Sequence, residues 1–170
     1  MRLRARDAMT PESRNPGEDS LTLDSDVHNV EALHEFIAAF CERNRFAEQV
    51  RDHLTVALEE LMVNAAVHGN CDPRKDAIRI ELRLVRDRVE VTFSDTGKPF
   101  NPLTMPLPDV SRDVGTRPIG GLGIYFVRSL IPEIRYERRD GRNYLFMAKP
   151  VGPAAESAGE GGENASRDAD

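Results

Sequence analysis

Two stretches of alternating apolar and polar residues constrain the fold of this chain more than any other feature. Residues 77–84 and 89–93 both alternate with a period of two, and a short charged turn joins them. This pattern is typical of strands with one buried face, so it predicts a β-hairpin. A second hairpin is predicted over residues 134–138 and 143–149, with its turn at Asp140-Gly141.

The remaining segments predict one further strand and three helices. Leu21-Thr-Leu23 alternates between apolar and polar and predicts the first strand. The helices are expected over about 27–43, capped by Asp26, over about 45–68, ended by Gly69, and over 124–130, stopped by Pro132. The order β-α-α-β-β-loop-α-β-β implies a mixed or antiparallel sheet with its helices packed on one face. We therefore expect an α+β fold, a two-layer α/β sandwich.

Composition limits the folded part to a single domain. Residues 1–18 and 151–170 are rich in Gly, Pro, Ser, Ala and acidic residues, and we expect both to be disordered tails. Residues 19–150 then form one domain, for which a hydrophobic content of 39% supplies a core. The stretch 98–117 is rich in Pro and Gly, and a loop of that length inside a domain is usually functional or mobile.

Charge, hydropathy and cysteine content narrow the classes of partner and the compartment. The net charge is −6, and residues 151–170 account for −4 of it with five acidic residues and one Arg. The body is therefore close to neutral, and we expect no direct nucleic-acid or membrane binding. No apolar run approaches the roughly 20 residues that cross a bilayer, and no secretory segment follows Met1. Because only Cys41 and Cys71 occur, we expect a cytoplasmic protein without disulfides.

A polar stripe runs along the second predicted helix. Glu60, Asn64 and His68 are spaced by four residues, so they share one face. Apolar residues flank the stripe on both sides: Leu54, Leu58, Leu61 and Ala65 on one, and Val56, Val63 and Val67 on the other. An unpaired carboxylate and amide in such surroundings are costly, so we expect them to have a ligand. Hydrogen bonds to ordinary loops are the alternative.

Two glycine-containing segments follow the stripe. Asp95 ends a predicted strand and could accept a hydrogen bond from an exocyclic amine, while Gly97 lets the backbone pass close to a flat or bulky group. Gly120-Gly-Leu-Gly123 opens the third helix, where unpaired N–H groups and the helix dipole attract phosphate. Both segments could also be simple turns. Their spacing matches neither a P-loop nor the dinucleotide-binding GxGxxG motif.

Taken together, the three segments resemble the N, G1 and G2 boxes of the GHKL ATPase superfamily, whose fold is a Bergerat-type α/β sandwich. More narrowly, they are similar to the anti-sigma factor serine kinases of the RsbW and SpoIIAB type. The similarity covers about residues 20–149, and its motifs are Glu60-x-x-x-Asn64-Ala-x-x-His68-Gly69, Asp95-x-Gly97-x-Pro99-Phe100-Asn101-Pro102 and Gly120-Gly-Leu-Gly123. The co-occurrence and spacing of the motifs make the resemblance specific.

The resemblance implies a role for each motif residue. Glu60 would act as the base toward the attacking hydroxyl, and Asn64 would ligate the Mg²⁺ that bridges the phosphates of ATP. Asp95 would hold the adenine amine, and Gly97 would admit the ring. The stretch 98–117 would be a lid that orders over the nucleotide. The nucleotide-binding set implied for this chain further includes His68, Phe100, Arg117, Gly120, Gly121, Leu122 and Gly123.

By the same resemblance, the chain would be a serine/threonine protein kinase and an anti-sigma factor. It would use Mg-ATP to phosphorylate a STAS-domain anti-anti-sigma factor in a partner-switching circuit, and it would alternately bind a sigma factor. A homodimer is implied by the family alone. The residues suit phosphoryl transfer, which needs a metal, charge-stabilising donors and an oriented nucleophile.

Two other functions fit the same residues. The chain could bind ATP and sequester a protein partner with little or no kinase activity, or hydrolyse ATP without a protein acceptor. A sensor histidine kinase fragment is disfavoured, because the Arg-Thr-Pro that usually follows a phosphoacceptor histidine is missing after His34. His68 and Cys71 resemble half a metal site, but no second ligand pair occurs.

Overall fold

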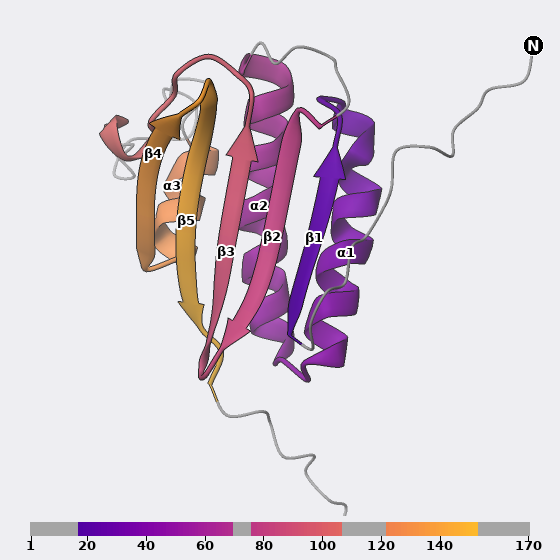
Figure 1. Cartoon of the computed structure of the whole chain (residues 1–170). Helices are drawn as coiled ribbons and strands as arrows, with labels where there is room; N and C mark the ends of the chain where they lie inside the picture. The colour runs from indigo at the N-terminus through magenta and orange to yellow at the C-terminus, as the bar shows by residue number, and fades with distance from the viewer. Residues whose placement is uncertain (1–16, 70–75, 107–121, 153–170) are drawn as a thin grey trace, which may run out of the picture.

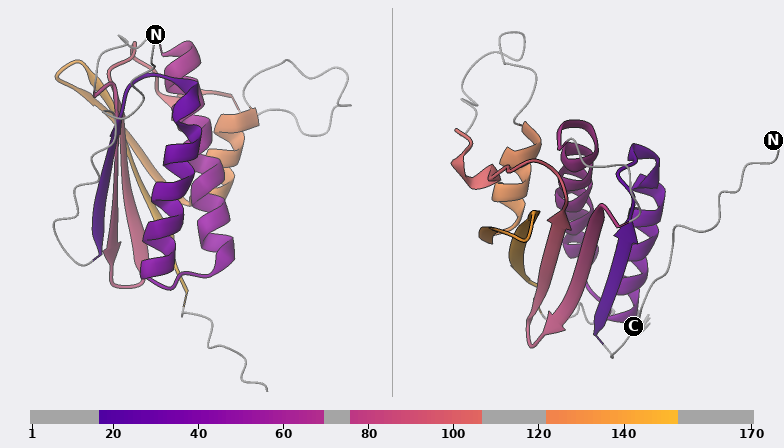
Figure 2. Two further views of the ribbon diagram at one scale, coloured as in Figure 1. Left: turned by 90° about the vertical axis from the view of Figure 1, so that its right-hand side faces the viewer. Right: turned by 45° about the horizontal axis from the view of Figure 1, so that its top comes forward.

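The protein is described by a computed structural model over residues 17–69, 76–106 and 122–152. Within these ranges, a five-stranded antiparallel sheet forms one layer, and helices cover one of its faces (Figures 1 and 2). This arrangement confirms the predicted α+β sandwich. The elements are β1 (Glu18–Leu23), η1 (Val27–Asn29), α1 (Val30–Arg43), α2 (Glu48–His68), β2 (Ile78–Val85), β3 (Arg88–Asp95), η2 (Pro102–Thr104), α3 (Leu122–Leu130), β4 (Glu133–Arg139) and β5 (Arg142–Pro150).

The strands follow the order β1-β2-β3-β5-β4, and every neighbouring pair is antiparallel. Both predicted hairpins are present, as β2–β3 and β4–β5. Because β5 lies beside β3, the second hairpin places β4 at the edge of the sheet. The register sets Asp95, the last residue of β3, directly opposite Asn143 on β5. Opposed residues of an antiparallel pair point to the same face, so these two polar side chains are neighbours.

Alternation along the strands separates a buried face from an open one. On β3, Val89, Val91 and Phe93 are buried against the helices, whereas Glu90 is exposed. The same face of the sheet packs on the apolar stripes of α1 and α2. The largest fully buried side chains are Phe40, Phe93, Leu21, Leu23, Leu33, Ile37, Leu54, Leu58, Met62, Ile78, Ile80 and Leu82. No helix in the three described ranges is long and apolar enough to span a membrane.

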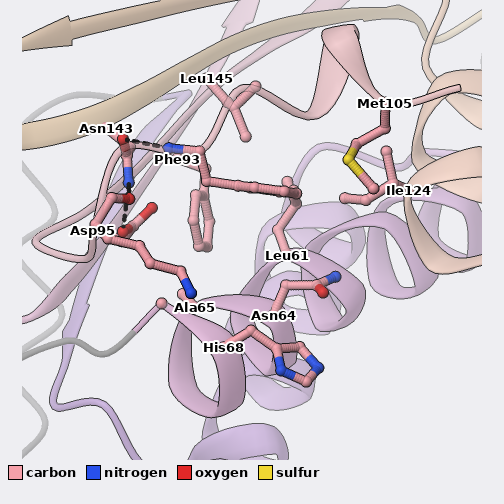
Figure 3. A pocket seen from close by; sticks show the side chains of 13 residues that line it. Leu61, Asn64, Ala65, His68, Phe93, Asp95, Met105, Ile124, Asn143 and Leu145 are labelled. Carbon is pink, nitrogen blue, oxygen red and sulfur yellow. Dashed lines mark hydrogen bonds between the residues drawn. The ribbon is translucent and has the colours of Figure 1, made fainter. Parts of the chain in front are cut away.

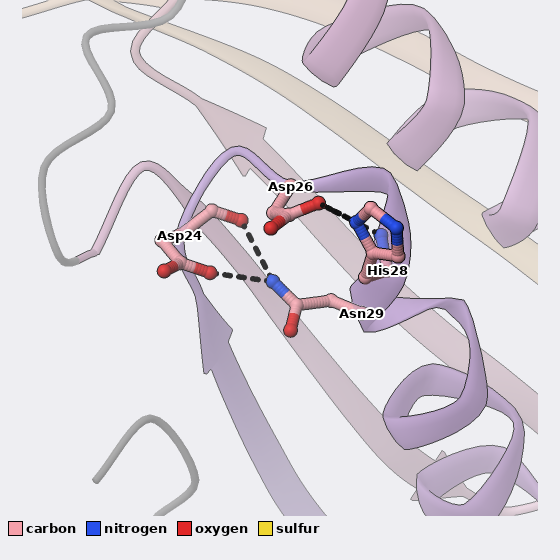
Figure 4. Close-up of polar contacts among 4 residues, drawn as sticks. All are labelled: Asp24, Asp26, His28 and Asn29. Atoms are coloured by element: carbon pink, nitrogen blue, oxygen red, sulfur yellow. Dashed lines mark hydrogen bonds and ion pairs between the residues drawn. The ribbon is translucent and has the colours of Figure 1, made fainter. Parts of the chain in front are cut away.

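Asp26, predicted to cap the first helix, caps the 3₁₀ turn η1 that leads into α1. The Asp26 carboxylate accepts hydrogen bonds from the backbone N of His28 at 2.9 Å and from its ring Nδ1 at 2.7 Å (Figure 4). Asn29 ties the same turn back to the strand by donating to the Asp24 carbonyl at 3.3 Å. These bonds shape a 3₁₀ turn, and the α-helix itself begins at Val30.

Several element boundaries differ from those predicted by up to three residues, and the starts of β1 and α2 are two of them. β1 begins at Glu18, three residues before the predicted segment, because Glu18 to Ser20 continue the ladder with residues 81–83 of β2. α2 begins at Glu48, since Arg45 adopts a positive φ of 55° and Ala47 is extended, which ends one helix and starts the next. The C-terminus of α2 is at His68, with Gly69 as its cap.

Candidate functional site

A cavity of about 410 Å³ opens between the C-terminal half of α2 and the sheet, where β3 ends and β5 begins (Figure 3). Its apolar walls come from both layers: Leu61, Ala65, Phe93, Ile124 and Leu145. Its polar side chains include Asn64 and His68 on α2 and Asp95 and Asn143 on the sheet. Gly69, Lys98, Phe100 and Met105 complete the lining. A mainly apolar cavity of this size with a few polar groups suits a small organic ligand.

Two of the three residues in the predicted polar stripe line this cavity. Asn64 and His68 do so, while Glu60 lies one helical turn earlier and is not part of the lining. Asn64 Nδ2 donates to the backbone carbonyl of Glu60 at 2.7 Å. This bond fixes the orientation of the amide, in which Oδ1 is the acceptor. The second apolar flank of the stripe faces solvent in part, because Val56 and Val67 are 41% and 56% exposed.

The first and third motifs meet at the start of α3. A Cβ added at Gly123 would overlap the Glu60 carboxylate, so the Glu60 side chain fills the space beside Gly123. The packing of α2 against α3 brings these residues together. Glu60, the predicted base, thus lies next to the start of α3, which is predicted from the sequence to bind phosphate.

The second motif is held by the end of α2. Gly97 N donates to Asp95 Oδ1 at 2.8 Å, and Lys98 N donates to the Gly69 carbonyl at 2.7 Å. A Cβ at Gly97 would lie 2.7 Å from both the Gly69 carbonyl oxygen and Asp95 Oδ1. From the sequence, Gly97 was expected to admit a flat or bulky group. The group that approaches it in the structure is the protein's own Gly69 carbonyl.

Sequence reasoning missed several residues of the lining, among them Lys98, Met105 and Asn143. Asn143 is 4% exposed and lies beside Asp95. The alternation of its strand was visible, but the pairing of β5 with β3 and its register were not. Lys98 and Met105 belong to the stretch predicted as a lid, where no periodicity indicates which side chains turn inward.

Part of the predicted site lies outside the described residues. Arg117, Gly120 and Gly121 fall within 107–121, as does most of the proposed lid. Leu122 is described only as the first residue of α3. Phe100, in the described part of the stretch predicted as a lid, lines the cavity. Residues 1–16 and 153–170, most of the two predicted tails, are also outside.

The described thiol does not belong to this site. Cys41 lies in the core at 2% exposure, and burial raises the pKa of its thiol to about 11. Cys71 falls in the undescribed segment 70–75. Within the described ranges, no group of three or more His, Cys, Asp and Glu side chains could hold a metal ion.

An antiparallel sheet with helices on one face, a cavity lined by residues of the first two motifs, and Gly123 of the third motif beside Glu60 are typical of a GHKL-type α/β sandwich domain. The chain belongs to the histidine kinase-like ATPase domain family, whose profile matches residues 23–149. This match confirms the resemblance inferred from the motifs.

Curated relatives carry kinase names. The chain is 28% identical over 111 residues to the serine/threonine-protein kinase BtrW of Bordetella bronchiseptica, covering 65% of this chain and 78% of that protein. It is 25% identical over 109 residues to the serine-protein kinase RsbW of Listeria monocytogenes, covering 62% and 69%. With RsbW of Bacillus mycoides the identity is 26% over 113 residues, covering 64% and 70%.

A solved structure supports the fold. The structure of the RsbU and RsbW domains of a Mycobacterium tuberculosis protein superposes with a TM-score of 0.56 over 82% of this chain, at 15% sequence identity. The chain covers 35% of that longer protein. The α/β sandwich is therefore shared with a domain named RsbW.

Proposed function

We propose that this chain is an ATP-dependent serine/threonine protein kinase and anti-sigma factor that phosphorylates a STAS-domain anti-anti-sigma factor. The observation that carries the proposal is the cavity that Asn64 and His68 of α2 line together with Asp95 of β3. The names of the curated relatives support protein phosphorylation as the reaction.

The cavity fits the base of ATP. Phe93, Leu145 and Ala65 offer apolar walls to a flat purine ring, and Asp95 offers a carboxylate at the edge. The Asp95 carboxylate is fixed by the Gly97 N–H at 2.8 Å, so it would meet the exocyclic amine in one orientation. A buried acceptor of this kind favours a base that donates a hydrogen bond over one that presents a carbonyl.

The α2 side of the cavity fits magnesium. Asn64 Oδ1 is an uncharged oxygen whose orientation is set by the bond from Nδ2 to the Glu60 carbonyl, at 2.7 Å. Magnesium is usually held by one or two protein oxygens together with phosphates and water, so a cluster of carboxylates is not required. When bound, the ion would neutralise charge on the transferred phosphoryl group.

The role of the base that acts on the acceptor hydroxyl falls in this proposal to Glu60. Its carboxylate lies against Gly123 at the start of α3, one turn from Asn64 on the same helix. A carboxylate there would accept the serine or threonine proton and orient the oxygen toward the phosphoryl group. Its neighbour Glu59 has a different partner, because Glu59 Oε2 pairs with His34 Nε2 at 2.8 Å.

The proposal includes the partners of the circuit. The chain would bind a sigma factor in one state and the unphosphorylated anti-anti-sigma factor in the other, as a homodimer in the cytoplasm. Phosphorylation of the anti-anti-sigma factor would release it. The RsbW names among the relatives support this circuit.

A labelling experiment tests the reaction. The purified protein is incubated with γ-labelled ATP, magnesium and a cognate STAS-domain protein, and label on a serine or threonine of that protein is expected. Glu60→Gln should abolish labelling while calorimetry still detects ATP binding. Asn64→Ala should lose the magnesium-dependent part of that binding.

The matched control is Glu59→Gln, which removes the adjacent carboxylate of the same helix and should leave labelling unchanged. Equal loss of labelling in both glutamine variants would refute the role given to Glu60. ATP binding without any labelling would instead favour the alternative, a regulatory module that sequesters its partner. Absence of heat from ATP with magnesium would refute nucleotide binding altogether.

A further inference from the structure

A fully hydrogen-bonded amide, that of Asn143, lies beside the Asp95 carboxylate, which is predicted to bind the adenine amine. Asn143 is 4% exposed, lines the cavity and stands opposite Asp95 in the β3–β5 register (Figure 3). A buried amide in a sheet is costly unless its donors and acceptors are all used. The bonds that Asn143 makes therefore indicate what it does.

The amide is locked in one orientation. Its Oδ1 accepts from Arg138 Nη1 at 2.7 Å, from Tyr136 Oη at 2.9 Å and from Phe100 N at 3.4 Å. Its Nδ2 donates to the Lys98 carbonyl at 2.9 Å and to Asp95 Oδ1 at 2.9 Å. Arginine has only donors and carbonyls have only lone pairs, so a flipped amide would face donor against donor and acceptor against acceptor.

The lock fixes the carboxylate as well. Asp95 Oδ1 receives two N–H groups, from Asn143 Nδ2 at 2.9 Å and from Gly97 N at 2.8 Å. Two donors converging on one oxygen restrict rotation of the carboxylate. Arg138 reinforces the arrangement, because the same Nη1 also donates to the Gly97 carbonyl at 3.0 Å. The β4–β5 hairpin thus sets the geometry of the Asp95–Gly97 turn.

We propose that Asn143 is a specificity-determining positioning residue, which holds the Asp95 carboxylate so that the cavity selects a purine carrying a 6-amino group. The inference rests on the proposed nucleotide binding and assigns the source of its base selectivity. A carboxylate discriminates well only when its oxygen is already in place, since an acceptor free to rotate can turn to other donors.

The test compares two nucleotides that differ only at the base. ATP has the 6-amino group, and purine riboside triphosphate lacks it, so the ratio of their dissociation constants isolates the contact with Asp95. For the native protein we expect ATP to bind roughly 10- to 100-fold more tightly, the range of a hydrogen bond to a charged group. Effects on the phosphates, the metal or the fold change both constants and cancel in the ratio.

Asn143→Asp replaces the donor that faces Asp95 with a second carboxylate of the same shape. At pH 8 the ratio is expected to fall to within about threefold of unity, in line with the loss of one charged hydrogen bond. As the pH is lowered toward 5.5 the ratio should recover. Two facing carboxylates raise the pKa of one of them, while the positive charge of Arg138 beside residue 143 keeps the other ionised, and the protonated form restores a donor. A purely structural role would show no such recovery.

Two further variants complete the design. Asn143→Ala removes the amide without adding a titratable group, so its ratio should be low at every pH, and it serves if the aspartate variant does not fold. Asn44→Asp is the matched control, since its Nδ2 donates to the Phe40 carbonyl at 2.8 Å at the end of α1 and Asn44 belongs neither to the cavity lining nor to the motifs. The control should keep the native ratio.

The outcomes separate this inference from the proposed function. If folded Asn143→Asp or Asn143→Ala protein keeps the native ratio at pH 8, with both nucleotides weakened equally, the positioning role is refuted and ATP binding stands. If the native protein binds neither nucleotide, both the proposed function and the role of Asn143 in base selectivity are refuted.

Discussion

Gly97→Ala tests whether the turn after β3 depends on close backbone packing. The added Cβ would lie 2.7 Å from the Gly69 carbonyl oxygen and from Asp95 Oδ1, whereas ordinary contacts begin at 3.4 Å. The Gly69 carbonyl belongs to the backbone at the end of α2, so it cannot swing aside as a side chain does. The turn and the helix end must therefore separate.

The magnitude follows from the bonds that this separation stretches. The Lys98 N to Gly69 O bond at 2.7 Å and the Gly97 N to Asp95 Oδ1 bond at 2.8 Å both cross the crowded region. Each contributes about 1 kcal/mol. Overpacking destabilises the folded state by about a further 1 kcal/mol. The lower conformational entropy of the unfolded alanine variant offsets about 0.4–1 kcal/mol of the total loss. We expect a net loss of about 2 kcal/mol in the free energy of unfolding, together with weaker nucleotide binding.

Urea denaturation followed by circular dichroism measures this loss, and a shift of the midpoint by about 1 M is expected from typical m-values. Gly141→Ala is the matched control. Gly141 has a φ of +77° and no atom within 4 Å of an added Cβ, so that variant is subject to backbone strain alone, about 1 kcal/mol. A Gly97→Ala protein as stable as the native one, or no less stable than Gly141→Ala, would refute the packing argument.

Two further predictions concern groups away from the cavity. In a Cys71→Ser background, a thiol reagent at pH 8 should find no reactive thiol until urea unfolds the protein, because Cys41 is buried and its pKa is about 11; rapid reaction of the native protein would contradict this. Desolvation, followed by the nearby charge of Lys149, lowers the pKa of His53 below 6.5. The unfolded chain therefore takes up the proton first, and stability should fall as the pH drops below about 6.5, as measured by urea midpoints at pH 7.5 and 5.5. His53→Gln should reduce that fall, and an unchanged pH dependence would show that His53 does not contribute.

Much of the fold could be predicted because its signals are local. The alternation of residues 77–84 depends on burial of one face of a strand, and the structure keeps that alternation in β2. Asp26 predicted the start of a helical segment through its own side chain, and it caps the 3₁₀ turn that leads into α1. The boundary of α2 was placed too early, since the positive φ of Arg45 has no signature in a residue type that usually avoids it.

The sequence by itself determined the layers of this protein and the three motifs, because the periodicity of a strand or helix and the spacing of Glu60, Asn64 and His68 on one face are properties of neighbouring residues. Only the tertiary structure decided that β5 lies beside β3, which sets Asn143 against Asp95 and locks the carboxylate through Arg138 and Tyr136. Register between strands some 50 residues apart in the chain depends on how two hairpins dock. That docking depends on the packing of the whole core, so it cannot be predicted from any short segment of the sequence.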